Sequence, residues 1–436
     1  MQKITGEIEI SPQKIGLIKR KINNIFDFKE EIKKNLQKPV TELAEIVLGG
    51  AVNLEASDIH IEPEETESKL RLRIDGILQD VLFFPTGIYQ TFLSRIKLLS
   101  GIKLNIADRP QDGRFSIIIG SYPIEIRTST LPAEHGESIV LRVLNPKNLI
   151  DIEALGLRKD LLELFKKEIK RPNGMIIVTG PTGSGKTTTL YAFLKKVQNP
   201  EVKIITIEDP IEYHLKGISQ TQVNPSKGYD FASGLKSIMR QDPDVVLVGE
   251  IRDLETAQMA LQAALTGHLV FTTLHTNDAA GTVSRLMALG AEPSNIGPAI
   301  NIAIAQRLVR KVCGRCSKTE TISSQEMEKI KDELKNSLGL LKKWGIKIPK
   351  LTPGLKIPKT EGCRVCNSTG FKGRIGIFEA FLIDAEIEKF ILSKPSIAAL
   401  KELAIKKGMI TMKQDGLIKV LEGLTTLEEV ERIAGE

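Results

Sequence analysis

Residues 175–190 read MIIVTGPTGSGKTTTL, and this stretch constrains the fold more than any other part of the chain. The apolar run Met175–Val178 is typical of a buried strand. The residues after it fit the pattern G-x-x-x-x-G-K-[ST], and from Thr188 onward the sequence suits the start of a helix. Strand, glycine-rich loop and helix in this order predict an α/β fold.

The loop also predicts a site for a nucleoside triphosphate. A polyphosphate needs several converging backbone N–H groups, and glycine lets the backbone curl tightly enough to supply them. The N-terminus of the next helix adds its dipole and its unpaired N–H donors. Lys186 would reach the β- and γ-phosphates of ATP, and Thr187 would bind Mg²⁺. The predicted ATP-binding residues are Gly180, Pro181, Thr182, Gly183, Ser184, Gly185, Lys186, Thr187 and Thr188.

Length and composition set the broad class. A chain of 436 residues is too long for one compact core, so we expect two or three domains. Its longest apolar runs, such as Val245–Val248, have strand length, whereas a membrane span needs roughly 18–20 residues. The N-terminus lacks an apolar signal core, which favours a cytosolic location. The net charge of +7 would suit nucleic acid or an anionic membrane, but the lysines are scattered, which favours solvated faces.

Three segments differ in their patterns. Residues 1–38 are polar and basic, and we interpret them as an N-terminal extension or linker. Residues 39–150 mix a helical pattern with short alternating strands, which predicts a small α+β domain. Residues 151–436 begin with alternating strands and helices, the pattern of a mostly parallel sheet covered by helices. This largest domain continues with a cysteine-bearing insertion (311–375) and two or three short helices (384–436).

Carboxylates follow two of the expected strands in the largest domain. Nucleotide sites in parallel sheets lie at the carboxyl ends of the strands, where a carboxylate can hold Mg²⁺ or orient the attacking water. We predict that Glu250, in VGEIRD, is the catalytic carboxylate. Glu208, Asp209 and Glu212, in IEDPIE, would hold the water shell of the metal. The structural alternative for these residues is helix capping or surface charge.

Two histidines flank the next expected strand, Leu269–Thr273. His275 follows the strand on the nucleotide side, and we predict that it senses the γ-phosphate. His268 precedes the strand, and a structural and a functional role both stay open for it.

The four cysteines form two C-x-x-C pairs, Cys313 with Cys316 and Cys363 with Cys366. Four thiolates in this pattern suit tetrahedral Zn²⁺. The segment between the pairs is long, but a long loop adds little closure entropy. Disulfides are disfavoured in the cytosol, and two pairs argue against a single redox dithiol. We therefore predict a structural zinc site.

Several long motifs now resemble one known family. GPTGSGKTTTL, ITIEDPIEY, LKSIMRQDPDVVLVGEIRD and TGHLVFTTLHTNDA look like the Walker A, Asp-box, Walker B and His-box segments of the type II secretion and type IV pilus ATPases. ASDIHIE, LRIDGIL and RPQDGRFS resemble the smaller preceding domain of that family. The resemblance covers about residues 39–436.

This resemblance implies a RecA-like motor domain, a PAS-like N-terminal domain and a homohexameric ring in the bacterial cytosol. The ring would be peripheral to the inner membrane, where ATP hydrolysis would move a platform protein that adds pilin-like subunits to a filament. Arginines of the smaller domain would reach the triphosphate, with Arg114 and Arg127 as candidates among Arg71, Arg73, Arg109, Arg114, Arg127 and Arg142.

The cysteines also distinguish branches of the family. AQRLVRKVCGRC and GCRVCNSTGFKGRIGIFE look like the tetracysteine element of secretion and pilus-assembly ATPases, which retraction ATPases generally lack. The alternative is a nucleic-acid-handling P-loop protein with a zinc ribbon, but few aromatic residues accompany the basic ones here. About 38 residues precede the PAS-like region, fewer than in many members, so the resemblance predicts neither a docking partner nor cyclic-dinucleotide control.

Overall fold

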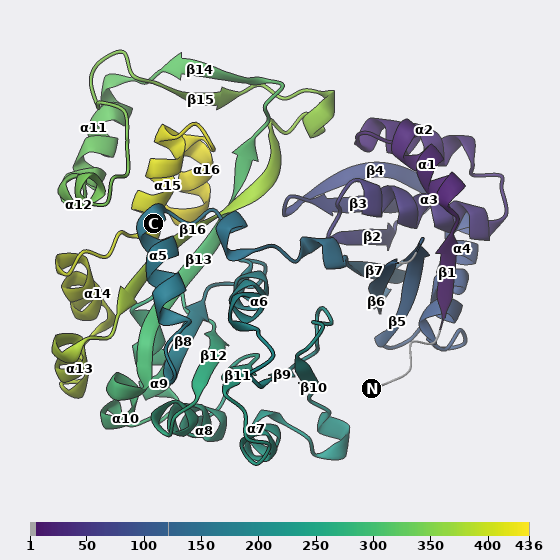
Figure 1. The fold of residues 1–436 in the computed structure, drawn as a ribbon. Helices are drawn as coiled ribbons and strands as arrows, with labels where there is room; N and C mark the ends of the chain where they lie inside the picture. Colours follow the sequence, from purple (N-terminus) through teal and green to yellow (C-terminus); the bar gives the residue numbers. More distant parts are fainter. Residues whose placement is uncertain (1–5, 121, 436) are drawn as a thin grey trace. The chain divides into compact units, whose positions relative to one another are not determined.

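The computed structural model describes residues 6–120 and 122–435, which form two compact units (Figure 1). Unit 1 comprises the chain up to Lys147 together with Cys313–Ser317 and Thr360–Gly373. Unit 2 comprises Asn148–Val312, Lys318–Lys359 and Arg374–Glu436. No helix of the described residues is long and apolar enough to cross a membrane.

Unit 1 is built on one large sheet. Its elements are β1 (Glu7–Ile10), α1 (Pro12–Lys21), α2 (Ile25–Lys34), α3 (Val40–Asn53), β2 (Asp58–Pro63), β3 (Glu67–Ile74), β4 (Ile77–Pro85), α4 (Thr86–Ser100), β5 (Gln111–Ile119), β6 (Tyr122–Ala133) and β7 (Gly136–Leu144). The strand order is β1-β5-β6-β7-β2-β3-β4, with β1 parallel to β5 and the other pairs antiparallel. Strand β3 has the alternation expected of a sheet with one buried face. Leu70, Leu72 and Ile74 are buried in the core, and the residues between them are polar.

The segment that we interpreted as an extension is folded into this unit. Strand β1 pairs with β5, and the side chains of its residues Ile8 and Ile10 are buried. Helices α1 and α2 bury Ile18 and Phe28 in the same core, and the ring of Phe28 is fully covered. The helical spacing of these apolar residues is weak against the many lysines around them, so the sequence alone did not reveal the burial.

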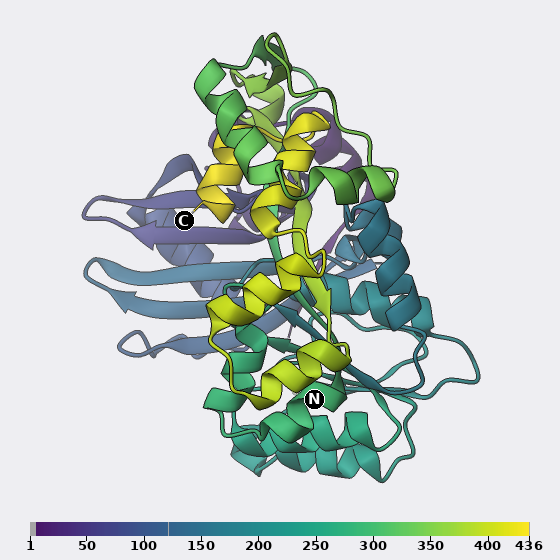
Figure 2. The same cartoon turned by 90° about the vertical axis from the view of Figure 1, so that its left-hand side faces the viewer.

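Unit 2 contains a parallel sheet with helices on both faces (Figures 1 and 2). Its first elements are α5 (Lys159–Glu168), β8 (Gly174–Thr179), α6 (Lys186–Val197), β9 (Ile204–Glu208), β10 (Ser219–Gln222), α7 (Phe231–Met239), β11 (Val245–Val248), α8 (Leu254–Leu265), β12 (Leu269–Leu274), α9 (Gly281–Ala288), α10 (Pro293–Ala299) and β13 (Ile300–Val312). Short 3-10 turns lie at Pro146–Asn148, Ile152–Ala154 and Pro225–Lys227. The strand order is β10-β9-β11-β12-β8-β13-β16, and the pairs from β10 to β13 are parallel.

The central strands are buried on both faces, as continuous apolar runs in such a sheet require. One face packs against α7, α8, α9 and α10, through residues such as Leu235 and Leu261. The other face packs against α5 and α6, through Phe165 and Phe193, whose rings meet edge to face. Because the strands are parallel, their carboxyl ends share one edge of the sheet.

The last part of the chain belongs to unit 2 except for Cys313–Ser317 and Thr360–Gly373. It consists of β14 (Ser317–Thr321), α11 (Ser324–Leu334), α12 (Leu338–Lys343), β15 (Lys356–Thr360), β16 (Phe371–Leu382), α13 (Ala385–Leu392), α14 (Ile397–Lys406), α15 (Met412–Leu421) and α16 (Leu427–Ala434). Figure 2 shows the C-terminal helices, in yellow and yellow-green, in front of this sheet. Four helices, α13 to α16, occupy the region for which the sequence predicted two or three.

Candidate functional site

The glycine-rich loop joins β8 to α6, as the sequence predicts. Gly180, Gly183 and Gly185 all have positive φ, at 148°, 78° and 89°. A Cβ on Gly180 would lie 2.5 Å from the carbonyl oxygen of Gln306 on β13, so no side chain fits there. The loop therefore needs glycine both for its backbone conformation and for its close approach to the neighbouring strand.

The N-terminus of α6 is open toward this loop. Gly185 is its N-cap and offers no side-chain hydrogen bond, whereas the N-caps of α7 and α8, Asp230 and Asp253, each accept a backbone N–H. The first N–H groups of a helix without a side-chain cap are available to an anion. The hydroxyl of Ser184 in the loop is buried and has no hydrogen-bond partner among the described residues. These features fit a bound polyphosphate.

Lys186 lies over the loop, with Nζ 2.8 Å from the carbonyl oxygen of Gly180 and 3.2 Å from that of Pro181. Gln306 holds the back of the loop, since its Nε2 donates to the carbonyl of Ser184 at 2.7 Å and its Oε1 accepts from Thr189 at 2.7 Å. Gln306 was not predicted from the sequence, because its role depends on the pairing of β13 with β8.

Glu250 and His275 lie just beyond the carboxyl ends of β11 and β12, which are neighbours in the sheet. Nε2 of His275 is 3.4 Å from Oε2 of Glu250, and the side chain of Glu250 is 16% exposed. Arg252 pairs with the other carboxylate oxygen of Glu250 and lies 3.4 Å from Asp209. The structure thus brings these predicted residues together at the nucleotide edge of the sheet, beside an arginine that the sequence analysis did not single out.

Lys186 interacts electrostatically with the same cluster. Burial lowers the pKa of Lys186, and the charges of Glu250 and Glu212 oppose that shift. Burial also lowers the pKa of His275, with the positive charge of Lys186 acting in the same direction and Glu250 against it. Lys186, Glu250 and His275 therefore interact electrostatically with one another.

Glu208 has a more enclosed setting. It is buried at the end of β9, where it accepts hydrogen bonds from the hydroxyl groups of Tyr191 and Thr206 and from Nε2 of Gln220. Burial against Glu208 raises the pKa of Tyr191. Both carboxylate oxygens of Glu208 therefore accept hydrogen bonds from protein donors. Glu212 is half-buried, and its negative charge acts on Lys186. His268 lies at the opposite end of β12, where Nδ1 is 3.1 Å from the carbonyl of Ala263.

Arg114 and Arg127 lie in unit 1, directly opposite each other on β5 and β6. Arg142 on β7 is opposite Arg127, Asp58 on β2 is opposite Arg142, and Arg73 on β3 is opposite Asp58. Directly opposite residues share a face of the sheet. The result is a row of side chains across five strands, which we call the arginine row: Arg114, Arg127, Arg142, Asp58 and Arg73.

Carboxylates pair with members of the arginine row. Asp58 is buried and lies 3.0 Å from Nε of Arg142 and 3.4 Å from Nε of Arg73. Arg127 pairs with Glu125 at 3.1 Å. Like charges directly opposite one another destabilise a sheet, and guanidinium groups are strong hydrogen-bond donors to anionic ligands.

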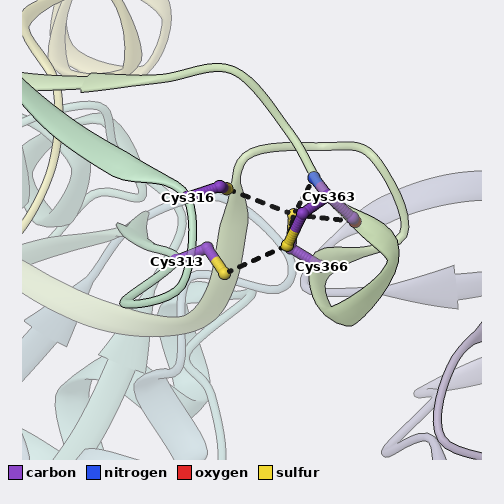
Figure 3. Close-up of side chains that lie close together, drawn as sticks. All are labelled: Cys313, Cys316, Cys363 and Cys366. Carbon is purple, nitrogen blue, oxygen red and sulfur yellow. Dashed lines mark hydrogen bonds between the residues drawn. The ribbon is translucent and has the colours of Figure 1, made fainter.

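The four cysteines come together as predicted (Figure 3). All four Sγ atoms lie within 4.8 Å of one another, with Cys313 to Cys363 at 4.0 Å and Cys316 to Cys366 at 3.7 Å. Four sulfurs about 2.3 Å from a tetrahedral Zn²⁺ would be about 3.8 Å apart, so the arrangement fits that ion. Backbone N–H groups of Cys363 and Gly370 donate to Sγ of Cys366, at 3.1 and 3.2 Å, as outer-shell donors do for a metal thiolate.

The tetracysteine element packs within unit 1. Oδ1 of Asn367 accepts the N–H of Ile25 at 2.8 Å, at the start of α2. Arg364 pairs with Asp27 on the same helix at 3.4 Å. A carboxylate oxygen of Asp75, in the turn between β3 and β4, accepts the N–H of Gly373 at 2.8 Å. From the sequence we placed the cysteines in the largest domain, and the domain boundaries remain a prediction.

A phosphate cradle at the carboxyl edge of a parallel sheet, with a carboxylate and a histidine beyond the neighbouring strands, defines a P-loop nucleoside triphosphatase of the α/β class. A family model described as "Type II/IV secretion system protein" matches residues 33–432. The chain therefore belongs to this family of secretion and pilus-assembly ATPases.

Two curated relatives support this assignment. The type IV pilus assembly ATPase PilB of Thermus thermophilus is 45% identical over 379 residues, which cover 86% of this chain and 41% of that protein. The type II secretion system ATPase E of Vibrio cholerae is 43% identical over 425 residues, which cover 95% of this chain and 80% of that protein. This chain thus spans less than half the length of the first relative and about four fifths of the second.

Solved structures agree on the fold. The ATPase DotB of Legionella pneumophila matches with a TM-score of 0.64 at 21% identity, over 91% of this chain and 96% of that one. The pilus retraction motor PilT with bound ADP matches with a TM-score of 0.58 at 26% identity, over 89% and 96%. The family resemblance and the RecA-like α/β fold class expected from the sequence are both confirmed.

Proposed function

We propose that the chain forms a homohexameric, Mg²⁺-dependent ATPase that powers pilus or pseudopilus assembly, or type II secretion, at the bacterial inner membrane. The observation that carries the proposal is the convergence of Lys186, Glu250 and His275 at one edge of the sheet in unit 2. The named relatives are a pilus-assembly and a secretion ATPase. This chain would be cytoplasmic and peripheral to the membrane, where it would contact a platform protein of the secretion or pilus machine.

The residues divide the work of phosphoryl transfer. The loop N–H groups and Lys186 would bind the β- and γ-phosphates, with the hydroxyl of Thr187 as a ligand to Mg²⁺. Bound Mg²⁺ would neutralise charge that develops on the phosphate oxygens. Glu250 would orient the attacking water and accept its proton, and Glu212 and Asp209 would hold the water shell of the metal. His275, beside Glu250, would respond to the γ-phosphate.

The arginine row would complete the site. Positive groups aimed at a transferring phosphate are worth on the order of 10³-fold in rate in related systems. Arg114 and Arg127 supply such groups from a folded sheet, which fixes them better than a loop would. The tetracysteine element, with Zn²⁺ bound, would be structural, because four thiolates leave no open coordination position.

Particle imaging and turnover together test the proposal. We expect rings of six copies in the presence of nucleotide and ATP hydrolysis that requires Mg²⁺ and is unchanged by DNA or RNA. Monomers on nucleic acid, with hydrolysis that nucleic acid stimulates and salt suppresses steeply, would instead show a nucleic-acid-handling protein.

A further inference from the structure

A buried carboxylate outside the nucleotide edge joins two distant segments of unit 2. Glu379 lies on β16 and is 2% exposed. Its Oε1 accepts the N–H of Ala279 at 2.9 Å, and its Oε2 accepts the N–H of Met412 at 3.1 Å. Burial raises the pKa of Glu379, and the two N–H groups oppose that shift. A carboxylate is costly to bury, so a specific role for it is worth seeking.

The Ala279 contact leads back to the candidate catalytic cluster. Ala279 lies in the loop between β12 and α9, only four residues after His275. The first part of this loop is held by Thr179, whose Oγ1 accepts the N–H of Thr276 at 2.8 Å. Its far end is held by Glu379. His275, whose side chain is 52% exposed, directly precedes the Thr276 anchor, and the Ala279 anchor follows three residues after Thr276.

The Met412 contact fixes the carboxylate itself. Met412 is the first residue of α15, so its N–H has no partner within the helix. The same helix is tied to β16 once more, because Oδ2 of Asp415 accepts the N–H of Phe378 at 2.7 Å. Asp415 is fully buried and also pairs with Arg158 and Lys419. Glu379 is therefore attached to a rigid frame on one side and to the His275 loop on the other.

We propose that Glu379 is a positioning residue for ATP hydrolysis: by holding the N–H of Ala279 it fixes the His275 loop, and so the approach of His275 to Glu250. The inference rests on the proposed function of His275 and Glu250. It also predicts that α15 and the nucleotide edge are coupled through one side chain, since both oxygens of Glu379 are in use.

Glu379→Gln tests this with little change in size. An amide has one acceptor oxygen, so its NH₂ group must face one of the two backbone donors. Because small displacements of reacting groups cost large factors in rate, we expect kcat for ATP hydrolysis to fall about 10-fold. The Kd for ADP should stay within about 2-fold, since the phosphate cradle is unchanged. Both are measured on the full chain with Mg²⁺.

A double-mutant cycle with His275→Ala identifies the route. If Glu379 acts through His275, Glu379→Gln adds no further loss of kcat in the His275→Ala protein. Losses that multiply would overturn the inference, as would an unchanged kcat in folded Glu379→Gln. If His275→Ala itself leaves kcat unchanged, or if the wild-type chain does not hydrolyse ATP, the proposed function is wrong. That result differs from one in which only the inference about Glu379 is wrong.

Glu429→Gln is the matched control. Glu429 is also a buried carboxylate of unit 2, and it binds Arg310 and Arg432 far along the chain from the His275 loop. Glu429→Gln should lower the melting temperature but leave kcat within about 2-fold at temperatures where the protein is folded, because Arg310 and Arg432 belong to β13 and α16 and not to the His275 loop. A loss of kcat equal to that of Glu379→Gln would show a purely structural effect.

Met412→Pro covers the case in which Glu379→Gln does not fold. Proline is tolerated at the first position of a helix, and Thr411 before it has φ −69° and ψ 160°, which proline accepts. The change deletes the N–H that anchors Oε2 and also the buried side chain of Met412, so the reference is Met412→Ala, which removes the side chain and keeps the N–H. We expect kcat to fall about 3-fold, and this loss should vanish in the His275→Ala background. Wild-type kcat in Met412→Pro would count against the coupling.

Discussion

His275 and Glu250 approach each other to 3.4 Å, from the ends of two parallel strands that are neighbours in the sheet. The two residues are far apart in the chain, and no local sequence pattern predicts their contact. The pairing of β11 with β12 in register makes it, because it places both strand ends at one edge. We propose that an imidazole in this position responds to the phosphate group that Glu250 faces.

Glu250→Gln should abolish ATP hydrolysis while the protein still binds ATP. The amide keeps the shape of Glu250 but cannot accept a proton, so we expect kcat to fall by about 10³-fold, within the range for loss of a general base. The Kd for ATP, measured with a fluorescent analogue, should change by less than about 3-fold. Lys186→Ala is the comparison, and it should weaken binding and turnover together. Equal loss of affinity in both variants would argue against the assigned roles.

The pH dependence of kcat should reflect His275. Burial and Lys186 lower the pKa of His275 below 6.5, so the folded protein binds its proton less readily than the unfolded chain does. The contribution of His275 to the free energy of unfolding therefore rises as the pH increases from the folded-state pKa of His275 to 6.5. It is lost as the pH falls below 6.5. We expect the acid limb of the kcat profile to lie below pH 6.5 and to change in His275→Gln. His268→Gln, at the other end of β12, should leave the profile as it is.

Removal of zinc should loosen α2 as well as the cysteines. Asn367 and Arg364 of the tetracysteine element contact Ile25 and Asp27, so the start of the helix depends on that element. With a chelator or Cys363→Ser, we expect amide exchange to rise by about 10-fold or more in residues 25–34 and 360–373. Exchange in the phosphate loop should not change. If α2 keeps its protection after the metal is lost, the element does not support it.

The arginine row should contribute to turnover more than to folding. Arg114→Ala or Arg127→Ala is expected to lower kcat by about 10-fold or more, since each removes a positive group proposed to act on the phosphate. Arg20→Ala, an exposed arginine on α1, is the control of equal charge change. Melting temperatures measured in parallel separate the two effects. A loss of kcat that simply tracks the loss of stability would contradict a role at the nucleotide.

Much of the candidate nucleotide site could be predicted from the sequence, because the sequence patterns that indicate it are local. Strand, loop and helix follow one another within residues 175–190, and each step has its own residue preference. The two C-x-x-C pairs carry their own ligand spacing, and the four sulfurs do come together. Glu250 and His275 could be placed because residues after parallel strands always meet at one edge.

Other features depend on register and long-range packing, which no local pattern encodes. The arginine row exists because five strands pair so that five separate positions stand opposite one another. Ile8, Phe28 and their neighbours look solvated among lysines, and only the pairing of β1 with β5 shows the core they join. Glu379 was one acidic residue among many until two backbone N–H groups from distant segments were found on its oxygens.

The sequence by itself determined that this chain carries a phosphate loop, a tetracysteine centre and the motifs of a secretion or pilus-assembly ATPase, because those depend on short stretches of adjacent residues. The tertiary structure alone decided which arginines share a face, what the tetracysteine element touches and how the His275 loop is held. The physical reason is that these contacts join segments far apart in the chain, whose relative register is set by burial of the whole core.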